Sequence, residues 1–184
     1  MCFTYLETER FVIRQWNSAD ATELEQLMAD PRVHRYTGDT PWTLDRARNY
    51  IRFMLDKNCR TLETFHGACV IKTSQTLIGY TGLNPYLPGQ PELEWQFGVP
   101  FWGNGYATEI GKAVIAAAFA STGIDRIYGM VNPLNKASLR VMEKIGMTRL
   151  GLQEFRGELD VFFKIDRAQP FDQSLSKPAG GRVW

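Results

Sequence analysis

The sequence predicts one α/β (α+β) domain, a mixed sheet with helices on both sides. The chain has 184 residues, 44% of them apolar and 22% charged, which is ordinary for a globular domain with a core of its own. Short β-type runs and segments with helical apolar spacing follow one another in the order β-α-α-β-β-β-α-β-α-β-β. We find no internal repeat in this order, which indicates a single folding unit.

The first strand and two helices come from the first third of the chain. Phe11–Arg14 is a β-type run. Asn17 or Ser18 can cap a helix over roughly 19–29, because their short polar side chains accept hydrogen bonds from the first turn. A second helix over roughly 43–57 has its apolar residues on one face.

Three strands are expected in the middle of the chain. The first two lie near 65–72 and 77–84 and are joined by the polar KTSQT, a hairpin signal. The stretch Asn84–Pro91 is rich in proline and glycine, and we expect a loop there. Polar and apolar residues alternate in the third strand, Glu92–Val99, so its two glutamates share one face.

Helices and strands alternate in the last third. A glycine-containing turn leads into a helix that runs to about Ala120, and Arg126–Val131 is the next strand. Asn132 or Asn135 caps a further helix, which Gly146 ends. The final two strands are expected near 148–155 and 159–165.

Composition excludes several classes of protein. The net charge of +1 lacks the basic excess of a nucleic-acid binder, so no nucleic-acid partner is expected. The longest apolar run, Ala113–Ala120, is too short to span a membrane, and the N-terminus lacks a signal peptide, which favours a cytoplasmic protein. Cys2, Cys59 and Cys69 have no metal or redox spacing, so no metal is expected.

The turn Trp102-Gly103-Asn104-Gly105-Tyr106-Ala107 stands between a strand and a helix. Glycines there allow backbone N–H groups to converge on an anion, and the following helix adds its positive N-terminal end, so the turn suits a pyrophosphate. A plain glycine turn is the alternative. A dinucleotide-binding motif is weaker, because Thr108 stands where a third glycine is needed.

A second motif, Asn132-x-x-Asn135-x-x-Ser138, follows a strand. Residues 135, 138 and 142 lie on one face of the expected helix and can line a groove. Helix capping with a solvent-facing hydroxyl explains the same residues when the motif is taken alone.

Together the two motifs resemble the GNAT superfamily of N-acetyltransferases, in particular its RimJ/RimL-like branch. The resemblance covers residues 6 to about 165 and implies a domain over 1–165, with a tail at 166–184 that we expect to be mobile. It also implies a mostly antiparallel sheet of about seven strands whose fourth and fifth strands splay apart. Five segments carry it: LETERFVIRQW, ADPRVHRYTGDTPWTLDRARNYI, LIGYTGLN, ELEWQFGVPFWGNGYATE and GIDRIYGMVNPLNKASLRVMEKIGM.

The resemblance implies acetyl-CoA as co-substrate and assigns residues to it. Pantetheine would lie between the splayed strands, and Asn135 matches the family's asparagine on the pantetheine arm. The tyrosine that many members use as general acid is replaced by Met142, and Ser138 is the substitute we expect. The expected cofactor-binding residues are Phe97, Gly98 and Val99 on the strand, Trp102, Gly103, Asn104, Gly105, Tyr106 and Ala107 in the loop, and Asn132, Asn135 and Ser138 beyond it.

The implied reaction is attack of an amine on the thioester in a ternary complex. Glu92 and Glu94 are the candidates for the base, directly or through water. A backbone N–H from about Phe97 to Val99 could stabilise the oxyanion, and Ser138 or solvent would protonate the thiolate. Residues expected near the acceptor are His34, Tyr36, Trp42 and Tyr86.

Three classes of function stay open. An active N-acyltransferase is favoured, with an acetyl group or another acyl group as cargo. A catalytically silent acyl-CoA-binding module is encouraged by the missing tyrosine, and a nucleotide-binding or structural domain is the third reading. The acceptor, a small amine, an amino acid or a protein N-terminus, is not named by the sequence, and a homodimer is expected by resemblance only.

Overall fold

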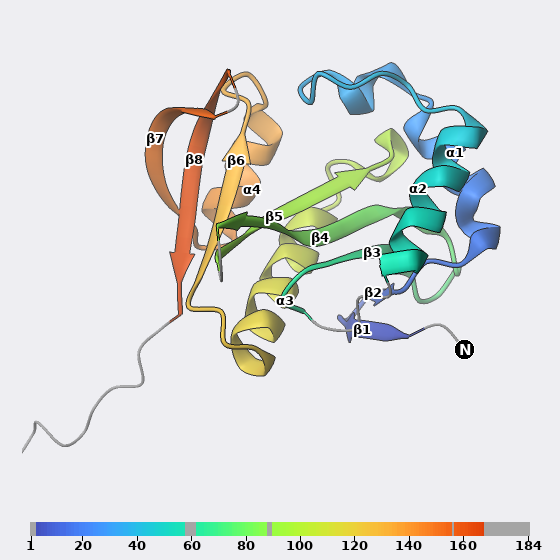
Figure 1. Ribbon diagram of the computed structural model, residues 1–184, viewed down its shortest axis with the longest axis horizontal. Helices are drawn as coiled ribbons and strands as arrows, with labels where there is room; N and C mark the ends of the chain where they lie inside the picture. Colours follow the sequence, from blue (N-terminus) through green and yellow to red (C-terminus); the bar gives the residue numbers. More distant parts are fainter. Residues whose placement is uncertain (1–2, 58–61, 88–89, 156, 168–184) are drawn as a thin grey trace, which may run out of the picture.

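The computed structural model describes residues 3–57, 62–87, 90–155 and 157–167. A single sheet of eight strands runs through it in the order β1-β2-β3-β4-β5-β6-β8-β7 (Figure 1). Every neighbouring pair is antiparallel except β5 with β6, so the expected mixed, mostly antiparallel sheet is confirmed. The strands are β1 (Thr4–Glu7), β2 (Phe11–Arg14), β3 (Phe65–Ile71), β4 (Leu77–Leu87), β5 (Gln90–Phe97), β6 (Arg126–Val131), β7 (Thr148–Phe155) and β8 (Glu158–Asp166).

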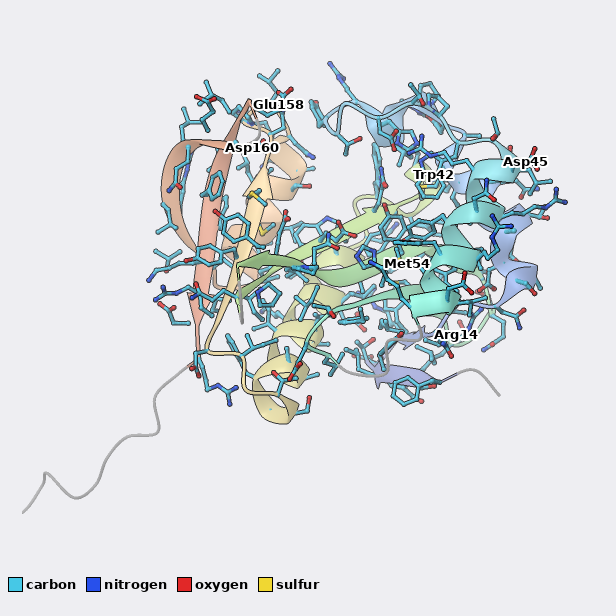
Figure 2. All side chains as sticks on the ribbon, viewed as in Figure 1. Arg14, Trp42, Asp45, Met54, Glu158 and Asp160 are labelled. Atoms are coloured by element: carbon cyan, nitrogen blue, oxygen red, sulfur yellow. The ribbon has the colours of Figure 1, made fainter. Side chains whose placement is uncertain are left out.

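Helices cover both faces of the sheet, as predicted. On one face α1 (Ala21–Met28) and α2 (Leu44–Lys57) pack with Leu24 and Met28 against the β2–β4 half. On the other face α3 (Tyr106–Ser121) and α4 (Lys136–Lys144) bury a second cluster that includes Leu93 and Val114. Figure 2 shows Trp42 and Met54 turned from the α2 side towards the sheet, whereas Asp45 points outward. Three short 3-10 turns complete the fold: η1 (Ser18–Asp20), η2 (Pro31–His34) and η3 (Val99–Phe101).

The eighth strand, β1, was not predicted. Thr4–Glu7 has only four residues, and its side chains are at most half-buried, so its apolar alternation is weak. It pairs with β2 at the sheet edge through a register shift between Thr4 and Leu6. Pairing with a neighbour, rather than a sequence pattern of its own, therefore makes this segment a strand.

The loop predicted at 84–91 is wrong, because β4 continues to Leu87 and β5 begins at Gln90. Pro85 and Pro91 are register partners in this part of the hairpin. The pairing of β4 with β3 ends at Leu83 of β4, and β5 pairs with β6 only at Glu92. Both prolines therefore lie in a part of the β4–β5 hairpin whose outer edges have no strand partner. A proline there removes no ladder hydrogen bond on that edge and is tolerated in a strand.

The parallel strands β5 and β6 meet at a single register pair, Glu92 with Tyr128, and diverge beyond it (Figure 1). All other neighbours in the sheet share at least three register pairs. The divergence leaves the backbone of β5 after Glu92 without a strand partner on its β6 side. This opening positions the site described below.

Arg167, the last described residue, is held in place by hydrogen bonds to the loop before β6. Its backbone N–H donates to the Asp125 carbonyl oxygen at 2.8 Å, and its guanidinium donates to the carbonyl oxygens of Thr122 and Ile124. Most of the tail expected at 166–184 lies outside the described residues. Within the described part of the chain, no helix is long and apolar enough to cross a membrane.

Candidate active site

A cavity of about 490 Å³ occupies the opening between β5 and β6. The loop after η2 forms its outer wall, and the corner from β6 into α4 forms the opposite wall. Six residues expected from the sequence line it together: Tyr36, Glu92, Glu94, Asn132, Asn135 and Ser138.

The strand alternation of β5 turns its polar residues towards this cavity. Glu92, Glu94 and Gln96 line it from one face of the strand. Leu93 and Trp95 also border it, while Leu93 and Phe97 belong to the buried core on the α3 side. Gln96 is fixed by Tyr80, whose hydroxyl donates to its Oε1 at 2.6 Å. The two carboxylates therefore face the place where a ligand between the strands would lie.

Glu94 is held by two side chains from neighbouring strands. His66 Nδ1 lies 3.0 Å from Glu94 Oε1, and the Asn84 amide donates to Glu94 Oε2 at 2.5 Å. Burial disfavours the charged imidazole, but the hydrogen bond and charge of Glu94 outweigh it and raise the pKa of His66. The contact of His66 with Glu94 depends on strand register, which the sequence does not display.

The turn after β5 has the conformation expected of an anion-binding loop. Gly103 and Gly105 have φ of +78° and +75°, values that glycine adopts without strain. Gly105 is the N-cap of α3, and no side chain caps this helix. The first N–H groups of α3 have no partner within the helix, so they are available to an anion together with the positive end of the helix dipole.

The end of β5 shows which backbone groups can serve a ligand in the opening. The Gly98 N–H donates to the Ile78 carbonyl oxygen in β4 at 2.9 Å, so it is already used. Because donors alternate along a strand, the Phe97 N–H points to the β6 side. The Trp102 indole donates to the Phe97 carbonyl oxygen at 2.7 Å, which fixes this side chain beside the strand end. Of the expected backbone donors, the geometry thus favours Phe97 over Gly98.

The start of α4 presents the second motif to the cavity. The Asn135 Oδ1 accepts the Ser138 N–H at 3.1 Å and caps the helix, so Asn135 rather than Asn132 is the cap. Asn132 closes the preceding turn by accepting the Leu134 N–H. The cap uses the oxygen of the Asn135 amide and leaves its Nδ2 as the donor on the cavity side.

Met142, the position of the missing tyrosine, is 2% exposed at the inner end of the cavity. It packs on Gly129 of β6, where an added Cβ would come within 2.7 Å of the Met142 methyl carbon. The thioether offers no proton, and Ser138 is the hydroxyl-bearing residue of α4 that lines the cavity.

Three residues expected near the acceptor do not line the cavity. His34 is 3% exposed and its Nε2 lies 2.7 Å from the Met28 carbonyl oxygen. Trp42 stacks on His34 and donates to Asp39. Tyr86 of β4 packs against Tyr128 of β6, across the intervening strand β5, with ring centres 5.0 Å apart. Of the four acceptor residues, only Tyr36 lines the cavity itself.

Comparison with known proteins decides the family. A family model described as "Acetyltransferase (GNAT) domain" matches residues 10–148. The chain belongs to the GNAT acetyltransferase family. Its eight-stranded sheet, with one parallel pair and helices on both faces, is the GNAT fold. Acetyl-CoA-dependent N-acetylation is the general reaction of this family.

Individual relatives agree with this assignment. The "Uncharacterized N-acetyltransferase p20" of Bacillus licheniformis is 29% identical over 150 residues, covering 80% of this chain and 84% of the relative. A GNAT-family acetyltransferase structure from Bacillus anthracis superposes with a TM-score of 0.76 at 25% identity, covering 91% of this chain and 99% of that one. A ribosomal-protein-S5-alanine acetyltransferase from Vibrio fischeri has a TM-score of 0.71 at 17% identity, covering 91% and 97%, and shows a like fold alone.

In this GNAT domain Arg10 fixes the turn that contains Gly103 and Gly105 from the side. Its guanidinium donates to Glu109 at 2.6 Å and to the Asn104 carbonyl oxygen at 3.3 Å, and it stacks over the Tyr106 ring. Thr8 also donates to Glu109, at 2.6 Å. Arg10 precedes a strand far from the loop in sequence, so no spacing pattern points to this contact.

Partial burial acts against the charge of Glu109, but its hydrogen bonds from Thr8 and Arg10 outweigh burial and lower its pKa. A carboxyl group whose pKa is lowered in the folded state stabilises the fold at pH values above its ordinary pKa of ~4.3. This stabilisation is lost as pH falls through the folded-state pKa. Glu109→Gln should therefore lower the free energy of unfolding by about 0.5–1 kcal/mol at pH 7, since Arg10 is partly exposed. Urea titrations should show that the free energies of unfolding of wild type and Glu109→Gln converge at acid pH. A difference that stays constant at every pH would contradict the stabilising ion pair.

Metal ligands do not gather in this GNAT domain. Over residues 3–57, 62–87, 90–155 and 157–167, no group of three or more histidine, cysteine, aspartate or glutamate side chains is placed to hold a metal ion. Cys69 is buried, and burial raises the pKa of its thiol far above the ordinary range. Its burial leaves it a packing residue of the sheet.

Proposed function

We propose that this protein is an acyl-CoA-dependent N-acyltransferase that transfers acetyl from acetyl-CoA to a primary amine by direct attack in a ternary complex. The observation that carries the proposal is the shared placement on β5: Glu92 and Glu94 face the cavity, and the anion-binding loop follows the end of the same strand. A thioester held along β5 by its pyrophosphate end would thus come beside two carboxylates.

The residues present fit acetyl-CoA by their donor chemistry. The N–H groups at the start of α3 suit the pyrophosphate, and the Asn135 amide suits the polar groups of the pantetheine arm. The Phe97 N–H would stabilise negative charge on the thioester oxygen, an effect typically worth ~3 kcal/mol per donor. Ser138 or solvent supplies the proton for the departing thiolate.

The charge of the cavity supports a cationic acceptor. Among the described residues that line it, Asp39, Glu92 and Glu94 are acidic and no lysine or arginine occurs. Two further carboxylates, Glu158 and Asp160, lie at the start of β8 outside the lining of the cavity (Figure 2); the neighbouring Val161 is the register partner of Val131, which does line it. Asp160 is partly buried next to Glu158, and both effects raise its pKa. A free amino acid would bring its own carboxylate into this negative field, whereas an amine without a nearby carboxylate would not.

Simple amines should therefore be acetylated in preference to free amino acids. We expect kcat/KM for an aliphatic amine or diamine to exceed that for an amino acid with the same side chain by at least about tenfold, mainly through KM. Paired substrates such as cadaverine and lysine measure this with the same acetyl-CoA assay. Methyl esters of the amino acid, which lack the carboxylate, should recover the difference. Equal values for lysine and its ester would argue against the electrostatic reason.

Membership of the RimJ/RimL-like branch and a cytoplasmic location are part of the same proposal. The five sequence segments support the branch, and a Vibrio fischeri enzyme named for a ribosomal protein has a like fold. At 17% identity that likeness does not extend to the acceptor, so a protein N-terminus is retained only as one form of primary amine.

The replacement of the general-acid tyrosine by Met142 favours one competing function, a catalytically silent acyl-CoA-binding module. Thiol release from acetyl-CoA against a panel of amines and short peptides separates the two. Turnover with one class of amine establishes the transferase. Tight binding of acetyl-CoA without turnover on any amine favours the binding module, and absence of acetyl-CoA binding contradicts both.

A further inference from the structure

The contact between His66 and Glu94 crosses an intervening strand. His66 of β3 is the register partner of Gly82 in β4, and Gly82 is the register partner of Glu94 in β5, so the three residues form one row. A Cβ on Gly82 would come within 3.0 Å of the His66 ring. Because neighbouring strands are ~4.8 Å apart, the imidazole can reach the carboxylate only over a residue without a side chain. Gly82 provides that space.

Asn84 determines which nitrogen of His66 can exchange a proton. A carboxylate only accepts, so the Asn84 Nδ2 must donate to Glu94 Oε2, and its Oδ1 is then turned to His66 Nε2. Nε2 therefore carries a hydrogen in every state of the network. Proton gain and loss are left to Nδ1, the nitrogen that faces Glu94.

Nδ1 has a partner in both of its states. When it carries a proton, it donates to Glu94 Oε1 at 3.0 Å. When it does not, it accepts from the Tyr50 hydroxyl at 3.1 Å. Burial raises the pKa of Tyr50 well above its ordinary value, so this hydroxyl stays protonated and remains a donor. The network thus accommodates His66 as imidazole and as imidazolium without a rearrangement of the backbone.

We propose that His66 and Glu94 act as a proton-accepting pair, in which Glu94 takes the proton of the acceptor ammonium and passes it to His66 Nδ1. An N–H bond of the ammonium breaks as an O–H bond forms on Glu94; that O–H bond then breaks as Nδ1–H forms, and the imidazole becomes imidazolium. The proton returns to solvent between turnovers. His66 does not touch the acceptor and acts through Glu94 as a positioning residue. This inference rests on the proposed transferase function.

The surroundings of His66 set the direction of its pH dependence. Burial lowers its pKa and Glu94 and Asn84 raise it, with a net rise above 6.5, while the nearby Lys57 acts in the lowering direction. Tyr50 and Tyr80, which also face the ring, are kept uncharged by burial. Since only neutral His66 can accept a proton, kcat/KM should rise with pH as His66 loses its proton.

Two substitutions should move this pH dependence in opposite directions. Tyr50→Phe removes the donor to neutral imidazole, so the pKa of His66 and the acid limb of kcat/KM should both move to higher pH. Glu94→Gln removes the carboxylate, so the pKa of His66 should fall. His66→Gln should abolish this limb and lower kcat by about 10- to 100-fold. Tyr5→Phe, which deletes a hydroxyl beside Phe65 on the opposite face of β3, is the matched control and should change none of these.

The pKa of His66 can be measured without turnover, by NMR titration of histidine-labelled protein. The chain has only two histidines, so the His66→Gln spectrum assigns both signals. The proton-accepting pair is supported if the pKa of His66 rises in Tyr50→Phe and falls in Glu94→Gln, and if the acid limb of kcat/KM in Tyr50→Phe moves with the pKa. An unshifted His66 signal in Glu94→Gln, or an acid limb retained in folded His66→Gln, overturns the proposal and leaves the transferase intact. A wild type that acetylates no amine overturns the proposed function, and this inference with it.

Discussion

Replacing Glu94 with glutamine should lower kcat for acetyl transfer by about 10²- to 10³-fold at pH 7.5, while the affinity for acetyl-CoA stays unchanged. A positioned general base typically contributes 10²- to 10⁴-fold, and the neighbouring Glu92 or water can replace part of it. Glutamine preserves the length and the hydrogen-bonding capacity of the side chain, so the packing beside His66 and Asn84 should be retained. The loss should appear in kcat rather than in KM for acetyl-CoA.

Glu92→Gln is the matched control, because Glu92 lines the same cavity on the same face of β5. It lies where β5 meets Tyr128 of β6 rather than against His66. We expect a loss of less than tenfold for this variant. Steady-state thiol release under saturating acetyl-CoA, with binding measured separately by calorimetry, compares the two. A larger loss of kcat in Glu92→Gln than in Glu94→Gln would identify Glu92 as the base.

Gly105→Val should raise the Kd for acetyl-CoA by at least about tenfold. Gly105 is the N-cap of α3 at a φ of +75°, a conformation that costs a residue with a Cβ roughly 1–2 kcal/mol and is rarer still for β-branched side chains. Valine should therefore favour a different turn in the free protein, and binding would have to restore the strained one. A cost of 1.4 kcal/mol corresponds to a factor of ten.

Gly157→Val separates this effect from a general loss of stability. Gly157 has a φ of +84° in the turn before β8, and no atom lies within 4 Å of an added Cβ. Its substitution carries a comparable backbone strain at a distance from the loop. Calorimetric titration with acetyl-CoA and thermal unfolding of both variants provide the comparison. Similar melting temperatures with equal affinities would show that the α3 N-terminus is not the anion site.

Most of the fold was readable from the sequence because the helices and central strands have strong apolar periodicity. The α2 helix lies within a residue of its expected bounds and α3 ends within a residue of its expected end, since their apolar faces repeat over several turns. The errors fell on Thr4–Glu7 and on 84–91, where tertiary pairing overrides weak or contrary local signals. A proline-rich stretch can extend a hairpin only when its outer edges are unpaired, which requires knowledge of the whole sheet.

The candidate site divides in the same way. Glu92, Asn135 and Ser138 lie in contiguous motifs, and the structure brings them to one cavity. His66 and Arg10 were missed, because each reaches the site through strand register or through a contact between distant segments. One clue was present in the sequence. When the strands β3, β4 and β5 are aligned as two hairpins, Gly82 falls between His66 and Glu94 in one row.

The single pairing of β5 with β6 has a consequence for folding cooperativity. Five strands lie on one side of this junction and three on the other, and each side is an antiparallel unit with its own hydrogen-bonded ladder. Units of this kind can open separately, with amide exchange reporting a lower opening free energy for the smaller one. A molecule bound across the junction would couple the two and stabilise them together in proportion to its affinity. Acetyl-CoA should therefore slow hydrogen exchange in β6 and β8 most. In the bound protein the two units of the sheet should then open together rather than separately.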